Sequence, residues 1–352
     1  MSKGVGHIPS LDGLRAVSFL IVFGSHTGVF KWIPGGFGVT VFFFLSGFLI
    51  TTLLRREATR SGHISLKNFY MRRVLRIWPP FYLVLVAAAA LCLAGIVPGK
   101  LEGPAVAAQA LHFANYWAFL RGYGGFPPGT GVYWSLAVEE HFYLLFPFVY
   151  LTFVRAKLPA ARQATILYAL CALVLVWRCV VTFVFHGSAE RVFVATDTRF
   201  DSILFGCALA VVGNPVLDPP TATERLWKYV FLPLGVLAIF CGLLAPIDWM
   251  KQTLRYTLQG VGLIPLFVCA VRFPAWWPFR PLNWRVTAYL GGLSYILYLV
   301  HQVVLYALEH AMGSRFPELV IAVVTLALSC FVAWLVHVSI EKPLARVRRR
   351  YS

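Results

Sequence analysis

The sequence predicts an all-α, polytopic integral membrane protein with about ten membrane-spanning helices and both termini in the cytoplasm. Of its 352 residues, 59% are hydrophobic and only 13% are charged, whereas soluble proteins average about a quarter charged residues. Long apolar runs recur along the whole chain. The 31 Lys and Arg outnumber the 14 Asp and Glu, for a net charge of +17, and such an excess can mark one side of a membrane.

Ten runs reach or approach the roughly 20 apolar residues that a spanning helix needs. The sixth and eighth are short and fit a tilted, a broken or a longer helix. In chain order the runs are 14–31, 37–54, 77–97, 131–153, 163–184, 200–213, 229–246, 257–271, 286–308 and 319–340.

The basic residues divide unequally between the two sides of this topology. With the N-terminus inside, the inner segments hold 21 of the 31 Lys and Arg, the outer segments hold 8, and Arg15 and Arg178 lie within spans. The positive-inside rule therefore predicts cytoplasmic termini. The first run has no small-residue cleavage site, which favours a retained helix over a signal peptide. A membrane accounts for the charge, so no nucleic-acid partner is expected.

Two connections are longer than the rest, although residues 1–352 are expected to form a single membrane domain. Segment 55–78 mixes basic and apolar residues and predicts a basic amphipathic helix on the cytoplasmic membrane surface. Segment 98–130 is an extracytoplasmic loop, rich in Gly and Pro, with an apolar piece at 107–120 that can dip into the membrane. The seven Cys lie in apolar runs without C-x-x-C spacing, so no disulfide or metal site is predicted.

Ionisable residues inside spans are functional candidates, because a charge at mid-membrane costs about 2.5–3.5 kcal/mol. Arg15 and His26 in the first run are eleven residues apart, so they share a helix face and lie about 16 Å apart. Asp12 has the spacing for an ion pair with Arg15. If the two residues have only structural roles, Arg15 would extend to the membrane interface and His26 would form a hydrogen bond to a neighbouring helix.

The fourth run opens with a polar cluster that includes Trp134 and Ser135. Ser135, Glu139 and Tyr143 follow one another at four-residue spacing and share a helix face. Such a face can supply a carboxylate that orients or deprotonates an imidazole. The alternative is an interfacial charge cluster that lipid headgroups solvate.

Two arginines, Arg73 and Arg76, stand three residues apart at the entrance of the third run, with Arg72 beside them. Guanidinium groups at this spacing can hold phosphate, although the spacing alone favours binding of anionic lipid. Weaker candidates lie in later runs, namely Arg178, Arg199, Asp201 and His301.

Together these motifs resemble the membrane acyltransferase-3 family. The resemblance is carried by Arg15-x10-His26, the segment 38–50, Arg73-x-x-Arg76 and the W-S-L-x-x-E-x-x-F-Y block at 134–143. The motifs occur in family order from residue 11 to about 343. Two later landmarks also match, Arg199-Phe200-Asp201 and Ser294-Tyr295 with His301.

The resemblance implies an enzyme of the bacterial inner membrane that modifies envelope polysaccharides by O-acetylation or a related transfer. An acyl group, commonly acetyl, would move from cytoplasmic acyl-CoA, the co-substrate, to a hydroxyl of an extracytoplasmic glycan, glycolipid or exported small molecule. Carried over by motif, His26 and Glu139 are the catalytic candidates. Arg15 completes the family's essential pair with His26, and Arg73 and Arg76 serve the donor's phosphates. No metal is expected.

Two departures from the family limit this transfer of roles. Many members have Asp where this chain has Thr40, so that carboxylate is not available here. Longer members carry a fused extracytoplasmic SGNH esterase-like domain that is not found in this sequence. The chain is therefore expected to complete the transfer itself or with a separate extracytoplasmic partner, and a homo-oligomer is compatible with the sequence.

On this hypothesis His26 is a general base towards the acceptor hydroxyl, or carries the acyl group covalently. Glu139 is expected to hold the imidazole in its working tautomer, and Ser135 is a further hydrogen-bond donor. Arg15 lies too far along the helix to touch the reacting carbonyl, so it is expected to bind the donor or to hold the first helix, and Arg72 is a further candidate beside Arg73 and Arg76 at the donor's phosphates. Two alternatives remain open: a proton-coupled transporter or flippase with an intramembrane His, Glu and Arg relay, and a structural membrane subunit.

Overall fold

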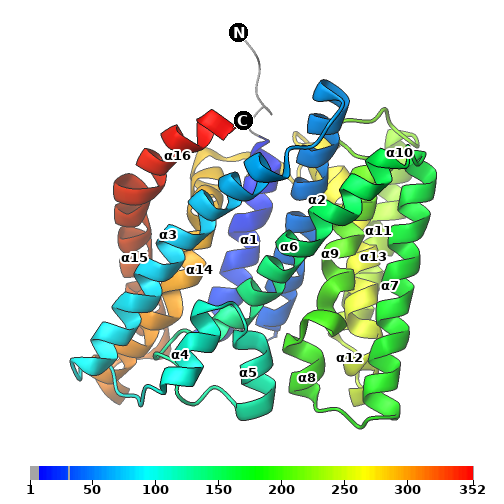
Figure 1. Cartoon of the computed structure of the whole chain (residues 1–352). Coiled ribbons are helices and arrows are strands. Elements are labelled where there is room, and N and C mark those ends of the chain that lie inside the picture. The colour runs from blue at the N-terminus through cyan, green and yellow to red at the C-terminus, as the bar shows by residue number, and fades with distance from the viewer. Residues whose placement is uncertain (1–7, 31, 352) are drawn as a thin grey trace.

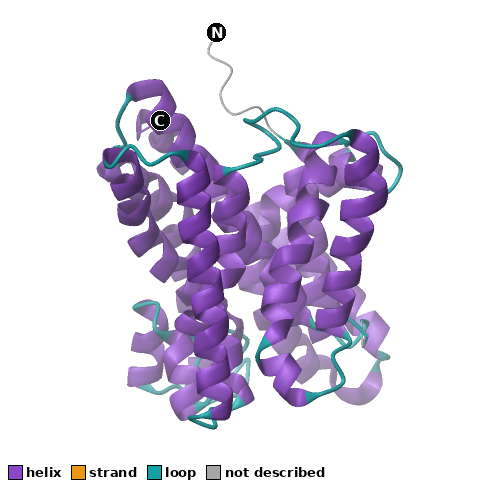
Figure 2. Ribbon diagram, turned by 90° about the vertical axis from the view of Figure 1, so that its right-hand side faces the viewer, coloured by secondary structure: helices purple, strands orange, loops and turns teal. Residues whose placement is uncertain are grey.

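The computed structural model describes residues 8–30 and 32–351, and within these ranges the chain is helical and contains no strand. Ten long helices form a bundle (Figure 1), and the loops gather at its two ends (Figure 2). The long helices are α1 (Pro9–His26), α2 (Gly35–Ser61), α3 (Leu66–Leu93), α6 (Trp134–Arg155), α7 (Ala160–Phe183), α9 (Thr196–Val211), α11 (Leu232–Leu243), α13 (Leu254–Arg272), α14 (Arg285–Met312) and α15 (Glu318–Val336).

Eight helical segments in the described ranges are long and apolar enough to cross a membrane, so the chain is an integral membrane protein. They overlap eight of the ten predicted runs, although several bounds differ. The other two runs correspond to α1 and α9, which have 18 and 16 residues. The first run was placed five residues too late: Pro9 opens α1 and the helix ends at His26. Residue 31, the end of that run, lies outside the described residues.

Shorter helices connect the long ones. A π-helical turn, η2, leads into α11, and a second, η5, joins α15 to the last α-helix. The short elements are α4 (Gly103–Ala110), α5 (Ala114–Arg121), η1 (Gly131–Tyr133), α8 (Ala189–Val194), α10 (Glu224–Leu226), η2 (Trp227–Phe231), α12 (Asp248–Gln252), η3 (Arg280–Asn283), η4 (Gly313–Arg315), η5 (His337–Glu341), α16 (Lys342–Arg348) and η6 (Arg349–Tyr351).

The two long connections differ from the sequence-based expectation in their local structure. Segment 55–78 is not one interfacial helix, because α2 continues to Ser61 and α3 starts at Leu66. Gly62 ends α2 with a φ of 71°, a conformation that glycine adopts readily. The Ser65 side chain then caps α3 by accepting from the Asn68 amide at 3.3 Å. The apolar piece at 107–120 is likewise divided between α4 and α5.

Two glycines allow α2 and α9 to pack with their backbones in contact. A Cβ added to Gly47 would lie 2.0 Å from the carbonyl oxygen of Ile203, and one added to Gly206 would lie 2.0 Å from that of Phe44. Small residues of this kind permit close helix packing in membranes. On the same side Phe44 packs against Phe267 of α13, with ring centroids 4.5 Å apart. This glycine seam therefore fixes α2 against α9 and α13.

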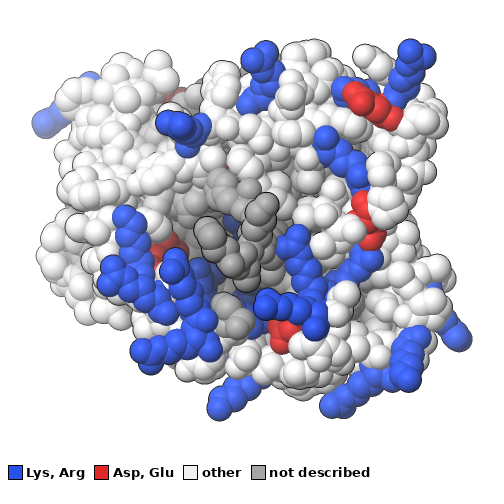
Figure 3. All heavy atoms as spheres, turned by 90° about the horizontal axis from the view of Figure 1, so that it is seen from above, with Lys and Arg blue, Asp and Glu red and all other residues white. Residues whose placement is uncertain are grey.

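One end of the bundle carries the start of α1 together with α16, at the top of Figure 1. Viewed onto this end, Lys and Arg side chains clearly outnumber Asp and Glu (Figure 3). We call this end the basic face. Its exposed cations include Arg60, Lys67, Arg155, Lys157, Arg162 and Arg346.

Candidate functional site

A cavity of about 540 Å³ extends from the basic face into the bundle. Its walls come from α1, α2, α3, α6, α14 and α16. Along α2 the lining residues run from Val39 to Leu53, a length of roughly 21 Å at 1.5 Å per residue. The outer part is lined by Ile8 and Arg348 and the deep part by Ser135 and Tyr298. A long, narrow ligand would therefore lie parallel to the helices.

Arginines line the half of the cavity nearer the basic face. Arg15 bonds Asp12 at 2.9 Å, as the spacing predicts. Arg73 stacks over the rings of Phe69 and Tyr143, at 5.8 and 5.7 Å, and its buried Nε has no hydrogen-bond partner among the residues that the structure describes. Within the described residues Arg76 makes no hydrogen bond or ion pair. Unpaired guanidiniums around a cavity favour an anionic ligand.

Glu139 faces the middle of the same cavity, where two hydroxyl groups bind it. Ser46 donates to its Oε1 at 2.9 Å, and Tyr143 donates to its Oε2 at 3.0 Å. The sequence predicted the shared face of Glu139 and Tyr143, but Ser46 comes from the middle of α2. The structure does not bring Glu139 to His26. Its carboxylate lies instead among the residues that line the cavity with Arg15 and Arg73.

The deep end of the cavity is closed by a hydrogen-bonded pair, Ser135 and Tyr298. Their hydroxyl oxygens lie 2.7 Å apart, and each lies within hydrogen-bond distance of the Val132 carbonyl oxygen, at 3.1 and 3.0 Å. Because each hydroxyl has one proton, one of the two donates to the other, and that other donates to the carbonyl. Tyr298 was not among the candidates from the sequence. Within the described residues, its hydroxyl makes the hydrogen bond that joins α14 to Ser135. A ligand in the cavity would end against this pair.

A pair of imidazoles lies one helical turn beyond the deep end. His301 follows Tyr298 by three residues on α14, which is about 4.5 Å of helix rise. Nδ1 of His26 lies 2.9 Å from Nε2 of His301, and the two rings are nearly parallel. His301 is fully buried, whereas His26 is partly exposed at the end of α1. Sequence reasoning ranked His301 among the weaker candidates, yet it is the direct partner of His26.

The hydrogen bonds of His301 fix the tautomers of the neutral pair. Its Nδ1 lies 2.8 Å from the carbonyl oxygen of Tyr298, and because a carbonyl only accepts, this nitrogen must carry the proton. Nε2 of His301 is then the acceptor for Nδ1–H of His26. Nε2 of His26 is left with a free lone pair, the form that a base or a nucleophile needs.

The other predicted residues lie outside the cavity lining. Arg72 pairs with Glu57 at 2.9 Å and donates to the backbone carbonyl of Tyr351. Asp201 pairs with Arg178 at 2.7 Å, and both side chains are fully buried. Trp134 packs edge-on against Phe43. Arg199 is also fully buried, stacked 3.9 Å from the ring centroid of Tyr256 and bonded to Thr40 at 3.0 Å.

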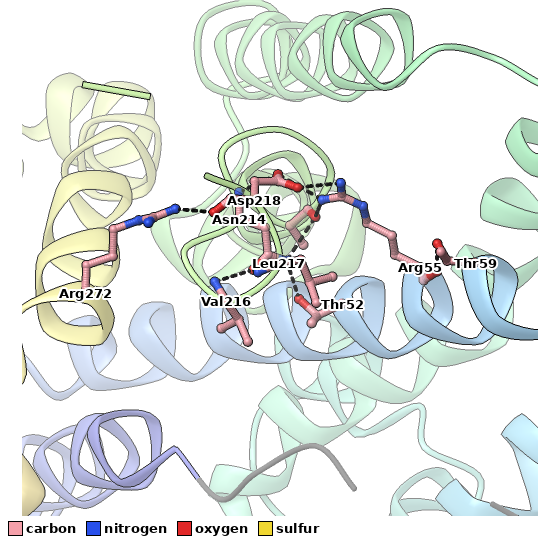
Figure 4. Close-up of polar contacts among 9 residues, drawn as sticks. Thr52, Arg55, Thr59, Asn214, Val216, Leu217, Asp218 and Arg272 are labelled. Carbon is pink, nitrogen blue, oxygen red and sulfur yellow. Dashed lines mark hydrogen bonds and ion pairs between the residues drawn. The ribbon is translucent and has the colours of Figure 1, made fainter. Parts of the chain in front are cut away.

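One wall of the cavity is held by a polar network at the basic face (Figure 4). Arg55 binds the Asp218 carboxylate, and Arg272 donates to the Asp218 carbonyl. Asn214 bonds Thr52 and the amide of Val216, a lining residue. Partial burial would raise the pKa of the Asp218 carboxyl, but the hydrogen bonds from Arg55 and the Asn214 amide outweigh burial and lower that pKa.

Comparison with known proteins identifies the family. A sequence profile described as "Acyltransferase domain" matches residues 8–338. The chain belongs to this acyltransferase family. This is the family that the motifs resembled. No solved structure matches the chain.

Named relatives match most of the length of this chain. It is 29% identical to "Peptidoglycan O-acetyltransferase OatA" of Listeria monocytogenes, over 97% of this chain and 56% of the relative. It is 31% identical to "Putative O-acetyltransferase SACOL0978" of Staphylococcus aureus, over 85% of this chain and 51% of the relative. The chain thus spans about half the length of these relatives.

Proposed function

We propose that this protein is a membrane O-acyltransferase that transfers an acetyl group from acyl-CoA to a hydroxyl of a cell-envelope glycan. The observation that carries the proposal is the order in which charged and catalytic groups follow one another along the cavity. Unpaired arginines line the cavity at its basic end, and the imidazole pair lies one turn beyond its deep end. A donor with phosphates at one end and a thioester at the other matches that order.

The proposed orientation places the basic face in the cytoplasm, as the positive-inside rule expects. Acyl-CoA, a polyanionic donor, would then enter from the side where it is made. Cations gathered on one face raise the local concentration of such a ligand. His26, partly exposed at the opposite end of α1, would meet an acceptor on the extracytoplasmic side.

The reaction needs a base at the acceptor hydroxyl, and Nε2 of His26 is that base in the proposal. It takes the hydroxyl proton while the oxygen attacks the thioester carbonyl. The C–S bond breaks, and the leaving thiolate takes the proton back from His26. In the second possible route, Nε2 itself attacks the thioester and CoA leaves. The acceptor oxygen then displaces the imidazole, and its proton ends on the thiolate.

His301 has the orienting role in either route. Orienting groups of this kind are usually carboxylates, and Glu139 was the candidate from the sequence. In the proposal Glu139 acts on the donor side, where its carboxylate offsets the charge of Arg15 and Arg73 along the acyl path. Ser135 and Tyr298 mark the point where the thioester must pass to reach His26.

The acceptor is assigned by chemistry and by relatives. The Listeria relative is named for O-acetylation of peptidoglycan, and a glycan hydroxyl is an acceptor of that class. We therefore propose a cell-wall glycan hydroxyl as the acceptor, with acetyl as the acyl group.

The test uses the full chain in proteoliposomes with acetyl-labelled acetyl-CoA inside and peptidoglycan fragments outside. The wild type is expected to label the fragments, and His26→Gln to abolish labelling. His301→Ala should lower kcat by at least about 10²-fold, the size of a lost acid–base contribution, with little change in the KM for acetyl-CoA. His310→Ala, an exposed histidine on the same helix, should behave as the wild type.

Several results would overturn the proposal. Full labelling by His26→Gln would remove the assigned base, and an unchanged kcat in His301→Ala would remove its orienting partner. Label trapped on protein quenched during turnover, and absent from His26→Gln, would select the covalent route. Accumulation of an unmodified solute without any acyl-CoA would favour transport instead.

A further inference from the structure

The C-terminal helix α16 lies against the cavity entrance. It follows the π-helical turn η5 and leaves the direction of α15, crossing the basic end of the bundle (Figure 1). Both α16 and η6 pack against α3, the helix that carries Arg73 and Arg76. Helix α15 lines no part of the cavity, whereas α16 contributes one residue, Arg348. The turn therefore brings a new element to the mouth of the proposed donor site.

Side chains of α2 and α3 fix the end of this segment. Arg72 of α3 donates to the backbone carbonyl of Tyr351 and also pairs with Glu57 of α2 at 2.9 Å. Arg72 thereby connects the last turn of the segment to two walls of the bundle. Its neighbour in sequence, Arg73, points into the cavity. These bonds thus hold the C-terminal segment beside the proposed donor site.

Arg348 differs from the other cations of its segment. Arg346, Arg349 and Arg350 are exposed, but Arg348 is partly buried and lines the cavity with Arg15 and Arg76. Within the described residues it makes no hydrogen bond or ion pair, and Glu341, which acts on it only electrostatically, bonds His337 at 2.6 Å. A partly buried guanidinium without a partner, at the rim of a cavity, is suited to a phosphate.

The order of groups in coenzyme A indicates which of its phosphates would meet Arg348. The thioester is at one end, the pyrophosphate follows the pantetheine arm, and the 3′-phosphate is carried on the ribose at the far end. From the deep end outward, the cavity presents Ser135, then Arg73, and finally Arg348 at the basic face. A phosphate monoester carries about −1.5 to −2 charges at pH 7. It is the most charged single group of the donor.

We infer that Arg348 of α16 binds the 3′-phosphate of coenzyme A and makes the site selective for the 3′-phosphorylated donor. The inference rests on the proposed donor site. Arg15, Arg73 and Arg76 are left to the pyrophosphate and the upper part of the pantetheine arm. The C-terminal helix thus sets which nucleotide thiol is accepted, without touching the reacting atoms.

The experiment measures binding, so it does not depend on turnover. Coenzyme A and 3′-dephospho-coenzyme A are titrated against the purified full chain in detergent, for the wild type, Arg348→Gln and Arg346→Gln. The wild type and Arg346→Gln are expected to bind coenzyme A at least about tenfold more tightly, as one charge-assisted bond provides. Arg348→Gln should lose that preference, with unchanged affinity for the dephosphorylated compound. Arg348→Lys should retain part of it.

Three outcomes would decide against the inference. Equal weakening of both compounds in Arg348→Gln would mean that Arg348 does not distinguish the 3′-phosphate. An unchanged preference would place that phosphate elsewhere, and binding of neither compound by the wild type would remove the donor site altogether. Selective binding of coenzyme A without acetyl transfer would instead remove the proposed function and leave the inference standing. Matching thermal unfolding midpoints exclude a folding defect in the variants.

Discussion

Two groups of arginines lie within the bundle, and they differ in how many protein groups bind them. Arg178 and Arg199 are fully buried, and protein groups surround them: Arg178 bonds Asp201, two backbone carbonyls and Thr257. The second group lines the cavity, and Arg76 and Arg348 make no hydrogen bond or ion pair within the described residues. A protein gains nothing in stability from an unpaired cation. The comparison therefore separates charges that are paired within the fold from charges that we propose bind a ligand.

The largest expected effect is on the first group. Asp201→Asn leaves Arg178 as an uncompensated buried charge, a change that costs about 3–5 kcal/mol. We expect a much lower thermal unfolding midpoint in detergent, whereas Arg76→Met, in the second group, should unfold at the wild-type temperature. Equal midpoints for both variants would erase the distinction between the two groups.

The surroundings of Arg199 offer a matched comparison. Thr40 accepts from Arg199 at 3.0 Å, while the buried hydroxyl of Thr51 on the same helix has no cationic partner among the described residues. A carboxylate at position 40 would gain an ion pair, but one at position 51 would be buried alone, which costs several kcal/mol. Thr40→Asp should therefore unfold at a higher temperature than Thr51→Asp. The reverse order would mean that aromatic faces already satisfy Arg199.

Substitutions in the second group, the arginines that line the cavity, are expected to change the KM for the donor. Arg76→Met is expected to raise the KM for acetyl-CoA by roughly 10- to 100-fold, the effect of about 1.5–3 kcal/mol for a hydrogen bond to a charged group. Arg76→Lys should recover only part of this, because lysine cannot bind phosphate with two parallel bonds. Steady-state kinetics at varied acetyl-CoA measure both. A change in kcat alone would place Arg76 outside the donor site.

The smallest effect concerns a partly exposed pair, Arg55 and Asp218. The lowered pKa of Asp218 means that its contribution to stability is present above the unfolded value of 3.8 and is lost as the pH falls through the lower folded value. Unfolding midpoints of the wild type should therefore decline in this acidic range more than those of Asp218→Asn. Parallel curves for the two proteins would indicate that this pair contributes nothing.

The span pattern was predictable, because every spanning helix needs its own apolar run. The motifs singled out Arg15, Arg73, Arg76 and Glu139 as candidates, and all four line one cavity, although Glu139 was expected beside His26. The ends of the helices were harder to predict. Pro9 is the first residue of α1, but it can be recognised as the start only once the helix is known. The division of segment 55–78 had local signals in Gly62 and Ser65, which sequence reasoning did not use.

The contacts between distant helices could not be predicted. His26 and His301 are 275 positions apart, and nothing in either run specifies that the two rings meet. Ser46 lies in an apolar helix without a local pattern that points to Glu139. Among four arginines within residues 346–350, only the turn of α16 selects Arg348. These facts depend on helix packing, which is settled by the whole bundle rather than by any segment.

The glycine seam also determines which part of the molecule can move. Gly47 and Gly206 leave no space between α2 and α9, so sliding or tilting of these helices would force backbone atoms to collide. We therefore expect the cavity wall formed by α2 to be the more rigid one. On the proposed function, entry of a donor would displace the facing wall, formed by α3, α14 and the short α16. We expect amide hydrogen exchange to be slowest in α2 and α9 and to respond to donor binding on the opposite wall.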